Sequence, residues 1–380
     1  MGFENTKEVR NEHLDNNLLP DQSVELVDSF GREHTDMRVS LTDRCNFRCV
    51  YCMKEDQAFE PMKLEMTTPE LLRSLNVARE LGINSIRFTG GEPLIRKDAT
   101  RVVRETSEMG FEDLAMTTNG SLLTRKVGAT SLAGELKNAG LERINVSCDS
   151  LNPEKFEKIR RRGKLENVLA GIEEARRVGL GPIKMNVVLI KGINDDEILD
   201  FAEYARESFR ENNPTIVRFI EYMPLGETGE KQVEWSPDKI VSSEEVFNII
   251  NEKWPLKIAS NQDDHAPAAR WEFADGQGQI GTIPTMTNPF CANCNRLRLT
   301  ADRFLMPCLF SQKKAKSSLR NAIRHPEGAT DEELKQIFIN TVWSKKKGQD
   351  REIPDIYINP GAYRSGSKVA QGVTMSQIGG

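Results

Sequence analysis

Three cysteines stand close together in the stretch RVSLTDRCNFRCVYC, which spans residues 38–52. They are Cys45, Cys49 and Cys52, at Cys-x3-Cys-x2-Cys spacing. Cysteine thiolates hold iron–sulfur cubanes, normally four thiolates to a cluster. No fourth cysteine and no histidine lies nearby, so one iron is left open, and an open metal position can bind a small molecule. The pattern therefore predicts a catalytic iron–sulfur site; three buried reduced cysteines, or a zinc knuckle that lacks one ligand, are the alternatives.

A second triplet occurs near the other end of the chain. Cys291 and Cys294 form a Cys-x2-Cys pair, and Cys308 follows after thirteen residues. A structural zinc site has four closed ligands, so a second open iron–sulfur cluster is the simplest interpretation and zinc is the alternative. Arg296 and Arg298 lie just after Cys294 in the sequence, and in a strand they would share one face. Guanidinium groups match phosphate oxygens well; an exposed basic strand is the alternative, but beside an open cluster we favour ligand binding.

The composition is that of a soluble globular protein, with 38% hydrophobic and 29% charged residues. A net charge of −5 argues against a nucleic-acid-binding surface, and no apolar run approaches the length of a membrane span. The polar N-terminus resembles neither a signal peptide nor a mitochondrial presequence. Seven cysteines without a secretory signal indicate a reducing compartment, hence a cytoplasmic location and metal ligation. The remaining one, Cys148, is expected to be a buried thiol that packs as a small hydrophobe.

Short apolar runs alternate with helical patterns through the first two thirds of the chain. Such alternation predicts βαβ units and a parallel sheet. The expected strands are 37–41, 84–88, 113–117, 143–147, 183–190 and 216–221. The expected helices are 67–82, 97–109, 131–139, 153–159, 165–178, 195–209 and 242–254.

The chemistry-bearing residues favour a barrel over an open sheet. Polar or glycine-rich segments follow nearly every expected strand, including the first cysteines, Gly90-Gly91-Glu92 and Thr118-Asn119-Gly120. The carboxyl ends of barrel strands converge on one face, where barrel enzymes place their sites. We therefore expect an α/β partial barrel over residues 25–250. A mobile N-terminal arm would precede it at 1–24, and a smaller α+β cluster-binding region, irregular from Pro255 onward, would follow at 251–380.

These segments resemble a known family. The first triplet, with Tyr51 before its last cysteine, resembles the signature of the radical S-adenosylmethionine (SAM) superfamily. Over nearly the whole chain the resemblance narrows to the GTP 3′,8-cyclase family (molybdenum cofactor biosynthesis protein A). It rests on RVSLTDRCNFRCVYCM, RFTGGEPLIRKD, TTNG, RINVSCDS, VRFIEYMP, PFCANCNRLRLTADRFLMPCLF and the terminal Gly379-Gly380. The chain departs from the family at Cys148, where leucine is more usual.

The resemblance implies a partial (βα)6 TIM-type barrel and a lyase with two [4Fe-4S] clusters. The first cluster would bind SAM and cleave it reductively to a 5′-deoxyadenosyl radical, which abstracts hydrogen from C3′ of GTP. The product would be (8S)-3′,8-cyclo-7,8-dihydroguanosine 5′-triphosphate, at the first step of molybdenum cofactor (molybdopterin) biosynthesis. The second cluster would hold the guanine through its open iron, and the Gly-Gly tail would reach into the site.

The resemblance also implies roles for individual residues. Gly90, Gly91 and Glu92 would line the amino-acid end of SAM, with Tyr51 near the adenine and the rest of that pocket formed by Thr117, Thr118, Ser147 and Met223. The triphosphate and the radical intermediate would meet Arg38, Arg87, Lys184, Arg218, Arg296 and Arg298, of which the last two are also expected to be catalytic. Any of the other four could instead be an ion-pair residue of the barrel, and Arg96 is a weaker candidate.

The family implies partners as well. A low-potential donor of the flavodoxin or ferredoxin type would supply electrons, and the product would pass to a cyclic pyranopterin monophosphate synthase. A homodimer is a family-level expectation. Three other interpretations stay open: a peptide-modifying radical SAM enzyme with an auxiliary cluster, a non-catalytic iron–sulfur carrier with closed clusters, and a zinc-binding interaction protein.

Overall fold

The computed structural model describes residues 25–211, 213–225, 233–260, 265–311, 317–324 and 328–348. The expected N-terminal arm at 1–24 and the terminal Gly379-Gly380 lie outside these residues. Within them, no helix is both long and apolar enough to cross a membrane.

Eight parallel strands form the centre of a twelve-stranded sheet. Six of them are the strands expected from the sequence, each within one residue of its expected ends, and they lie in the order β1-β2-β3-β6-β7-β8. Their bounds are Asp36–Ser40 (β1), Ser85–Thr89 (β2), Asp113–Thr118 (β3), Arg143–Ser147 (β6), Ile183–Leu189 (β7) and Thr215–Glu221 (β8).

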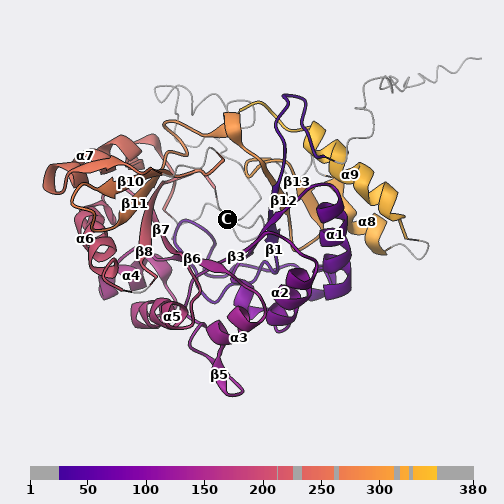
Figure 1. Ribbon diagram of the computed structural model, residues 1–380, viewed down its shortest axis with the longest axis horizontal. Coiled ribbons are helices and arrows are strands. Elements are labelled where there is room, and N and C mark those ends of the chain that lie inside the picture. Colours follow the sequence, from indigo (N-terminus) through magenta and orange to yellow (C-terminus); the bar gives the residue numbers. More distant parts are fainter. Residues whose placement is uncertain are drawn as a thin grey trace, which may run out of the picture.

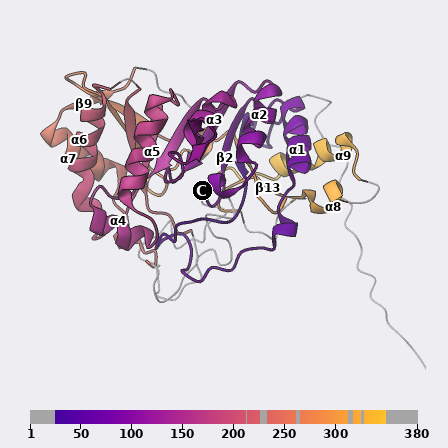
Figure 2. The ribbon, with the colours of Figure 1, turned by 90° about the horizontal axis from the view of Figure 1, so that it is seen from below.

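Helices cover the outer face of this curved sheet (Figures 1 and 2). They are Thr68–Glu80 (α1), Ala99–Glu108 (α2), Leu132–Asn138 (α3), Pro153–Arg160 (α4), Leu165–Arg177 (α5), Ile198–Ser208 (α6) and Ser243–Lys253 (α7). Local signals set where they begin. The Glu70 carboxylate accepts from the Thr67 amide at 2.7 Å, and the Ser242 hydroxyl accepts from the Glu245 amide at 3.1 Å. Both contacts satisfy amide groups that a helix start leaves unpaired.

The strands separate a packed outer face from a polar inner face. On β7, Ile183, Met185, Val187 and Leu189 are buried, and the residues between them are half-buried. Because successive side chains point to opposite faces of a strand, the buried set packs under the helices. The other set faces the inside of the barrel, which is therefore available for a ligand.

The C-terminal region continues the same sheet, which corrects our expectation of an irregular segment after Pro255. Two of its strands pair in parallel at the ends of the six-stranded core, β12 on β1 and β11 on β8. The others extend the sheet as antiparallel edges. The strands are Leu256–Ile258 (β9), Ala269–Phe273 (β10), Gln279–Ile283 (β11), Arg296–Leu299 (β12), Phe304–Met306 (β13) and Ser317–Ser318 (β14).

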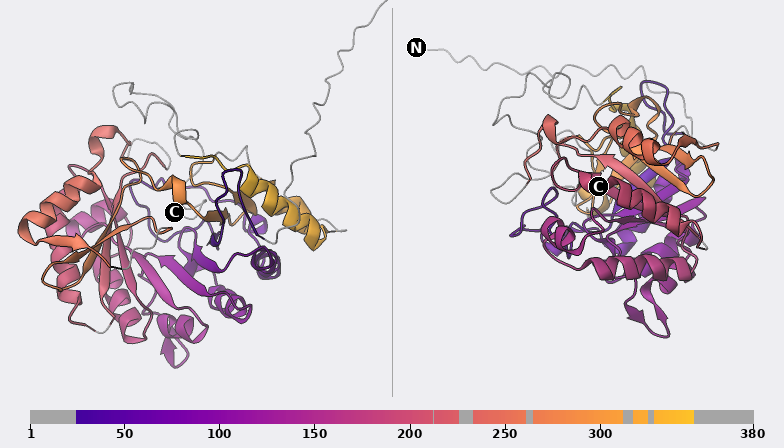
Figure 3. Two further views of the ribbon diagram at one scale, coloured as in Figure 1. Left: turned by 45° about the horizontal axis from the view of Figure 1, so that its top comes forward. Right: turned by 90° about the vertical axis from the view of Figure 1, so that its left-hand side faces the viewer.

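The sheet nonetheless remains open within the described residues, because its end strands β14 and β9 do not pair with each other. Helix α9 (Asp331–Trp343) packs against α1 beside α8 (Leu319–Arg324) (Figure 3). A hairpin of β4 (Lys126–Val127) and β5 (Thr130–Ser131) projects from the helical side (Figure 1). The predicted partial barrel is confirmed. The boundary at residues 250/251 stays a prediction, since one sheet runs through both regions.

Candidate active site

A cavity of about 270 Å³ occupies the inside of the barrel. Side chains from both cysteine triplets line it, together with residues of β1, β2, β3, β6, β7, β8 and β12. The expected site residues on its wall are Cys45, Cys49, Cys52, Cys291, Cys294, Cys308, Tyr51, Gly90, Gly91, Thr117, Thr118, Ser147, Met223, Arg38, Arg87, Arg218, Arg296 and Arg298. The fold thus brings two triplets about 240 residues apart in the chain to one space.

Backbone contacts with the glycine turn after β2 shape the loop of the first cysteines. The Gly91 amide donates to the Thr42 carbonyl at 2.8 Å, and the Glu92 amide donates to the Arg44 carbonyl at 2.7 Å. A Cβ atom on Gly91 would lie 2.1 Å from the Arg44 oxygen, and one on Gly90 would lie 2.3 Å from the Thr42 oxygen. Only glycine permits this approach of two backbones, so the glycine turn fixes the loop that carries Cys45.

Gly91→Ala is expected to empty the first cluster site. Its Cβ would collide with the backbone of Arg44, next to a ligand, and backbone cannot swing aside as a side chain can. We expect a loss of about four iron atoms per chain after anaerobic reconstitution, one cubane. Gly192→Ala is the control, because it has nothing within 4 Å and only the strain of a positive φ. If Gly91→Ala kept its full iron content, the Gly90-Gly91 pair would be an ordinary turn that is not needed for the cluster site.

Glu92 lies behind the wall of the cavity. Its carboxylate accepts from the Thr118 hydroxyl at 2.7 Å, the Asn119 amide at 2.7 Å and the Leu94 amide at 3.1 Å. Burial raises its pKa to about 7, even though these bonds favour the charged form. Glu92 therefore positions the Thr118-Asn119 turn, while its expected contact with SAM stays a prediction.

Five arginines form what we call the arginine wall: Arg38, Arg87, Arg218, Arg296 and Arg298. Strand register places three of them side by side, since Arg38 is level with Arg298 on one neighbour and with Arg87 on the other. Arg87, Arg218 and Arg298 are no more than 8% exposed. Burial, followed by repulsion from neighbouring cations, lowers the pKa of Arg38 to about 10 and those of Arg218 and Arg298 to about 9.

Asp36 offsets part of the mutual repulsion within the arginine wall. Burial would raise the pKa of Asp36, but the arginines around it hold that pKa below its usual value. The Arg38 Nε lies 3.5 Å from the Asp36 carboxylate. Among the described residues, the Arg87 Nε and the Asn145 Oδ1 have no hydrogen-bond partner. Buried cations and unpaired polar atoms on a cavity wall fit a polyanionic ligand with hydrogen-bonding groups.

Lys184, on β7, is half-buried and lies off the cavity wall. Burial lowers its pKa to about 7, with further contributions from Arg218, Arg143, Arg87 and Arg270. It therefore belongs to the same positive field without touching the cavity. Arg96 has a structural role instead. It donates to the carbonyls of Leu41 at 3.1 Å and Met66 at 2.9 Å and pairs with Asp98 at 2.8 Å.

The second triplet surrounds the start of β12. Cys291 begins a short 3-10 turn (Cys291–Asn293), Cys294 precedes Arg296, and Cys308 follows β13. Buried Lys345 lies with its Nζ 3.5 Å from the Cys294 Sγ and 2.6 Å from the Arg296 carbonyl. Burial alone would raise the pKa of Cys294, but Lys345 and Arg296 lower it. The site therefore favours a thiolate, the form that binds metal.

Both cysteine groups supply the thiolate donors of an iron–sulfur cluster. Among the described residues, no three His, Cys, Asp or Glu side chains converge to hold one metal ion. A cubane does not need that convergence, because each of its cysteines binds a different iron. All seven cysteines are free of disulfides. The thiol of Cys148 is buried, donates to the Ser150 carbonyl at 3.3 Å and has its pKa raised to about 12 by burial, as expected for a packing residue.

Sequence reasoning gave no role in the site to two residues beside the first triplet. Arg160 and Asp149 both line the cavity and form a buried ion pair at 2.9 Å. Asn145 and Asn186 also face the cavity, the latter accepting from the Arg218 Nη2 at 2.6 Å. The signal for Asn145 and Asn186 was available, because both sit at inward positions of expected strands. Arg160 gave no such signal, because it ends a helix that the sequence places outside the barrel.

Comparison with known proteins finds a different family match for each of two successive parts of the chain. Residues 39–205 match the Radical SAM superfamily, and residues 215–351 match the family described as Molybdenum Cofactor Synthesis C. A GTP 3′,8-cyclase of Corynebacterium glutamicum (strain R) is 40% identical over 335 residues, which cover 85% of this chain and 84% of the relative. A GTP 3′,8-cyclase of Peptoclostridium acidaminophilum is 45% identical over 296 residues, covering 77% and 86%.

Among solved structures, Streptococcus suis SuiB bound to S-adenosylmethionine has a similar fold. The TM-score is 0.52 with 14% sequence identity, and the match covers 77% of this chain and 64% of that one. At this identity the likeness concerns the fold alone.

Proposed function

The chain belongs to the GTP 3′,8-cyclase family of radical SAM enzymes, and from that premise we propose how its cavity serves two ligands. The activity is the radical SAM cyclisation of GTP in the first step of molybdenum cofactor biosynthesis. We propose that SAM occupies the end lined by Cys45, Cys49 and Cys52. GTP occupies the end lined by the arginine wall and by a second cluster on Cys291, Cys294 and Cys308.

Cys45, Cys49 and Cys52 would hold the first cluster, which would supply the electron for cleavage of SAM and so allow hydrogen to be taken from C3′ of GTP. The chain's own residues bind and orient the two ligands for this transfer. Gly90 and Gly91 present backbone to the amino-acid end of SAM. The Tyr51 hydroxyl donates to Asp149 at 2.7 Å, which fixes its ring for the adenine. Thr117, Thr118, Ser147 and Met223 complete that part of the wall.

The observation that carries the proposal is the shared cavity. Both triplets, each one ligand short of a closed cluster, line the same space as the arginine wall. A triphosphate would bring negative charge to guanidiniums whose pKa values burial and mutual repulsion already lower. Phosphates held there would fix the ribose at a set depth in the barrel, and positioning of this kind accounts for much of catalysis.

An anaerobic turnover assay tests the proposal. The protein is reconstituted with iron and sulfide and supplied with SAM, dithionite and one nucleotide: GTP, ATP or none. We expect 5′-deoxyadenosine to rise with GTP, together with a cyclised guanosine triphosphate. The matched variant Cys49→Ser, which removes a ligand of the first cluster, should yield neither compound.

Two other outcomes would overturn the proposal at different points. If SAM were cleaved equally with all nucleotides and no guanosine product formed, the cavity would serve another substrate. If fully loaded protein cleaved no SAM, the first cluster would have no open iron.

We propose the same partners that the family implies. A low-potential flavodoxin or ferredoxin would reduce the first cluster, and a cyclic pyranopterin monophosphate synthase would consume the product. Cytoplasmic location and a homodimer also stay proposals, and sedimentation of the reconstituted protein would decide the second.

GTP affinity is expected to fall as pH rises from about 7 to 8.5, because of Lys184. Its pKa of about 7 means that it has partly lost its proton in the free protein. Bound triphosphate favours the charged form, so the complex takes up a proton that the free protein lacks. Because one proton is taken up on binding, GTP affinity falls by at most about tenfold for each unit that the pH rises. Below pH 7 the free protein already carries this proton, so the affinity depends little on pH.

Equilibrium dialysis of GTP across this pH range would measure the effect. Lys184→Arg keeps the charge at every pH tested, so its profile should be flatter than that of the wild type. Titration of the phosphate itself is common to both proteins and cancels in the difference. Identical profiles would exclude Lys184 from the field that GTP meets.

A further inference from the structure

Arg160 makes a direct contact with a ligand of the first cluster. It is the last residue of α4, and its side chain is 4% exposed. Its Nη1 donates to the Cys49 Sγ at 2.9 Å, within the buried interior. Its Nη2 lies 2.9 Å from the Asp149 carboxylate. One guanidinium therefore bridges a cysteine ligand and a buried carboxylate.

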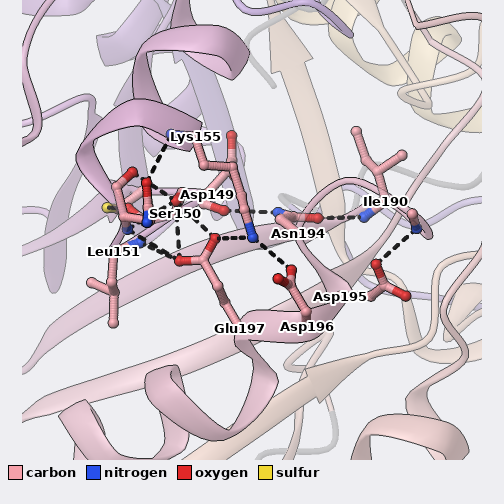
Figure 4. Close-up of polar contacts among 12 residues, drawn as sticks. Asp149, Ser150, Leu151, Lys155, Ile190, Asn194, Asp195, Asp196 and Glu197 are labelled. Atoms are coloured by element: carbon pink, nitrogen blue, oxygen red, sulfur yellow. Dashed lines mark hydrogen bonds and ion pairs between the residues drawn. The ribbon is translucent and has the colours of Figure 1, made fainter.

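Asp149 is itself held from several sides. Its Oδ2 accepts from the Tyr51 hydroxyl at 2.7 Å, and its Oδ1 accepts from the Val188 amide at 3.0 Å. The Asn194 side chain donates to its carbonyl at 2.7 Å and accepts from the Ile190 amide at 2.8 Å (Figure 4).

Hydrogen bonds also hold the residues that follow Asp149. Buried Glu197 accepts from the Leu151 amide at 2.7 Å and from the Ser150 hydroxyl at 2.8 Å (Figure 4). Lys155, the third residue of α4, reaches the same carboxylate at 3.0 Å. The anion that orients Arg160 is thus fixed by a network behind the cavity wall, and the guanidinium has little freedom to leave Cys49.

Arg160 also has hydrogen-bonding capacity to spare. Among the described residues, its Nε has no hydrogen-bond partner and its Nη2 meets only the ion-pair contact with Asp149, although the side chain is buried and lines the cavity. A guanidinium stays charged in proteins. Such a donor, with an Nε–H group to spare beside three cysteines, fits an anionic iron–sulfur cluster.

We propose that Arg160 is a positioning residue that raises the reduction potential of the first cluster through its hydrogen bond to Cys49. The proposal deepens the function given above and rests on Cys45, Cys49 and Cys52 being cluster ligands. Cluster potentials depend on net charge and on hydrogen bonds to the sulfurs. Reduction adds negative charge, so a buried cation on a ligand sulfur stabilises the reduced form, and its effect is strong because water is excluded.

Arg48 shows what a purely structural arginine looks like in the same loop. Its Nη1 donates to the carbonyls of Cys45 at 2.7 Å and Phe47 at 2.9 Å. These bonds hold the backbone and involve no sulfur. Arg162 offers a second comparison, because it lies two residues from Arg160, is exposed, and pairs with Glu55 at 2.5 Å. The chain thus supplies two matched control positions, one that holds the loop and one on its surface.

The test is a potentiometric titration of reconstituted protein followed by electron paramagnetic resonance. The first cluster is identified as the signal that changes when SAM is added, and iron content is measured on the same samples. In Arg160→Met we expect a tenfold or greater shift of the reduced-to-oxidised ratio toward the oxidised form at fixed potential, which for one electron is 59 mV or more downward. Arg160→Lys should shift less, because an ammonium cannot span both acceptors. Arg162→Gln should leave the potential of the first cluster unchanged. Arg48→Met removes a charge that makes no bond to sulfur, so it should shift the potential less than Arg160→Met does.

A merely structural role for Arg160 would alter iron content without moving the potential. The proposal is overturned if the first cluster of Arg160→Met titrates at the wild-type potential. Should Arg160→Met hold no iron at the first site, Arg160→Lys decides: a lowered potential supports the proposal and an unchanged one overturns it. Absence of any SAM-responsive signal in the wild type would instead count against the ligand assignment, which separates the two failures.

Discussion

Replacement of Arg87 by methionine is expected to stabilise the ligand-free protein and, at the same time, to weaken GTP binding. Arg87 is 8% exposed and lies in the middle of β2 on the cavity wall. Its Nε has no hydrogen-bond partner among the described residues. Burial lowers its pKa well below the usual value, and the charge of Arg38 lowers it further.

Methionine removes a poorly compensated buried charge and keeps most of the volume. Replacing buried ionic groups with apolar ones is often stabilising, here by about 1–3 kcal/mol. Removing one partner of a buried ion pair costs about 2–5 kcal/mol of binding energy, so GTP affinity should fall by about 30-fold or more. The gain in stability and the loss of GTP affinity have the same cause. The arginines of the wall repel one another in the ligand-free protein, and the triphosphate relieves that repulsion.

Thermal unfolding and equilibrium dialysis of the same preparations would measure both effects. Arg87→Lys keeps the charge and should be intermediate in affinity. Arg101→Met removes an exposed arginine of α2 that pairs with Glu105 in the same helix, so neither quantity should change appreciably. Lower stability with unchanged GTP affinity would make Arg87 an ion-pair residue of the barrel.

The sequence predicted the elements and the first triplet well because both depend on local pattern. Strand β7 alternates buried and half-buried residues over its whole length, so its range and inner face could be inferred. Cys45, Cys49 and Cys52 belong to one loop, so their convergence needed no knowledge of the fold. The glycine turn was recognised for the same reason, although its close approach to Arg44 was not visible.

The arginine wall depended instead on pairing between distant segments. Arg298 lies beside Arg38 because β12 joins β1 in parallel, across about 260 residues of chain. Our expectation of an irregular region after Pro255 hid that pairing, since short strands with many interruptions give a weak periodic signal. The Arg160–Cys49 contact was hidden for a similar reason, because only the packing of α4 against the cysteine loop creates it.

Cys308→Ala is expected to separate SAM cleavage from cyclisation. The variant leaves two cysteines at the second triplet, too few for a cubane, so we expect a loss of about four iron atoms per chain. The first triplet and its glycine turn are untouched, and 5′-deoxyadenosine should still form. The cyclic nucleotide should fall at least about 100-fold, because a reacting atom displaced by about 1 Å can already cost that much.

Cys148→Ala is the matched control, since it removes a cysteine that lies off the cavity wall and should keep both iron and product. Cys49→Ser, which removes a ligand of the first cluster, should form neither 5′-deoxyadenosine nor the cyclic nucleotide. If Cys308→Ala still cyclised GTP fully, the second cluster would have no part in the reaction. If metal analysis found zinc at the second triplet of the wild type, the site would hold a structural metal and not a cluster. Arg296 and Arg298 lie on β12, which begins two residues after Cys294. A substrate bound at the second cluster would therefore also contact the arginine wall. Loss of that cluster should for this reason abolish the cyclic product.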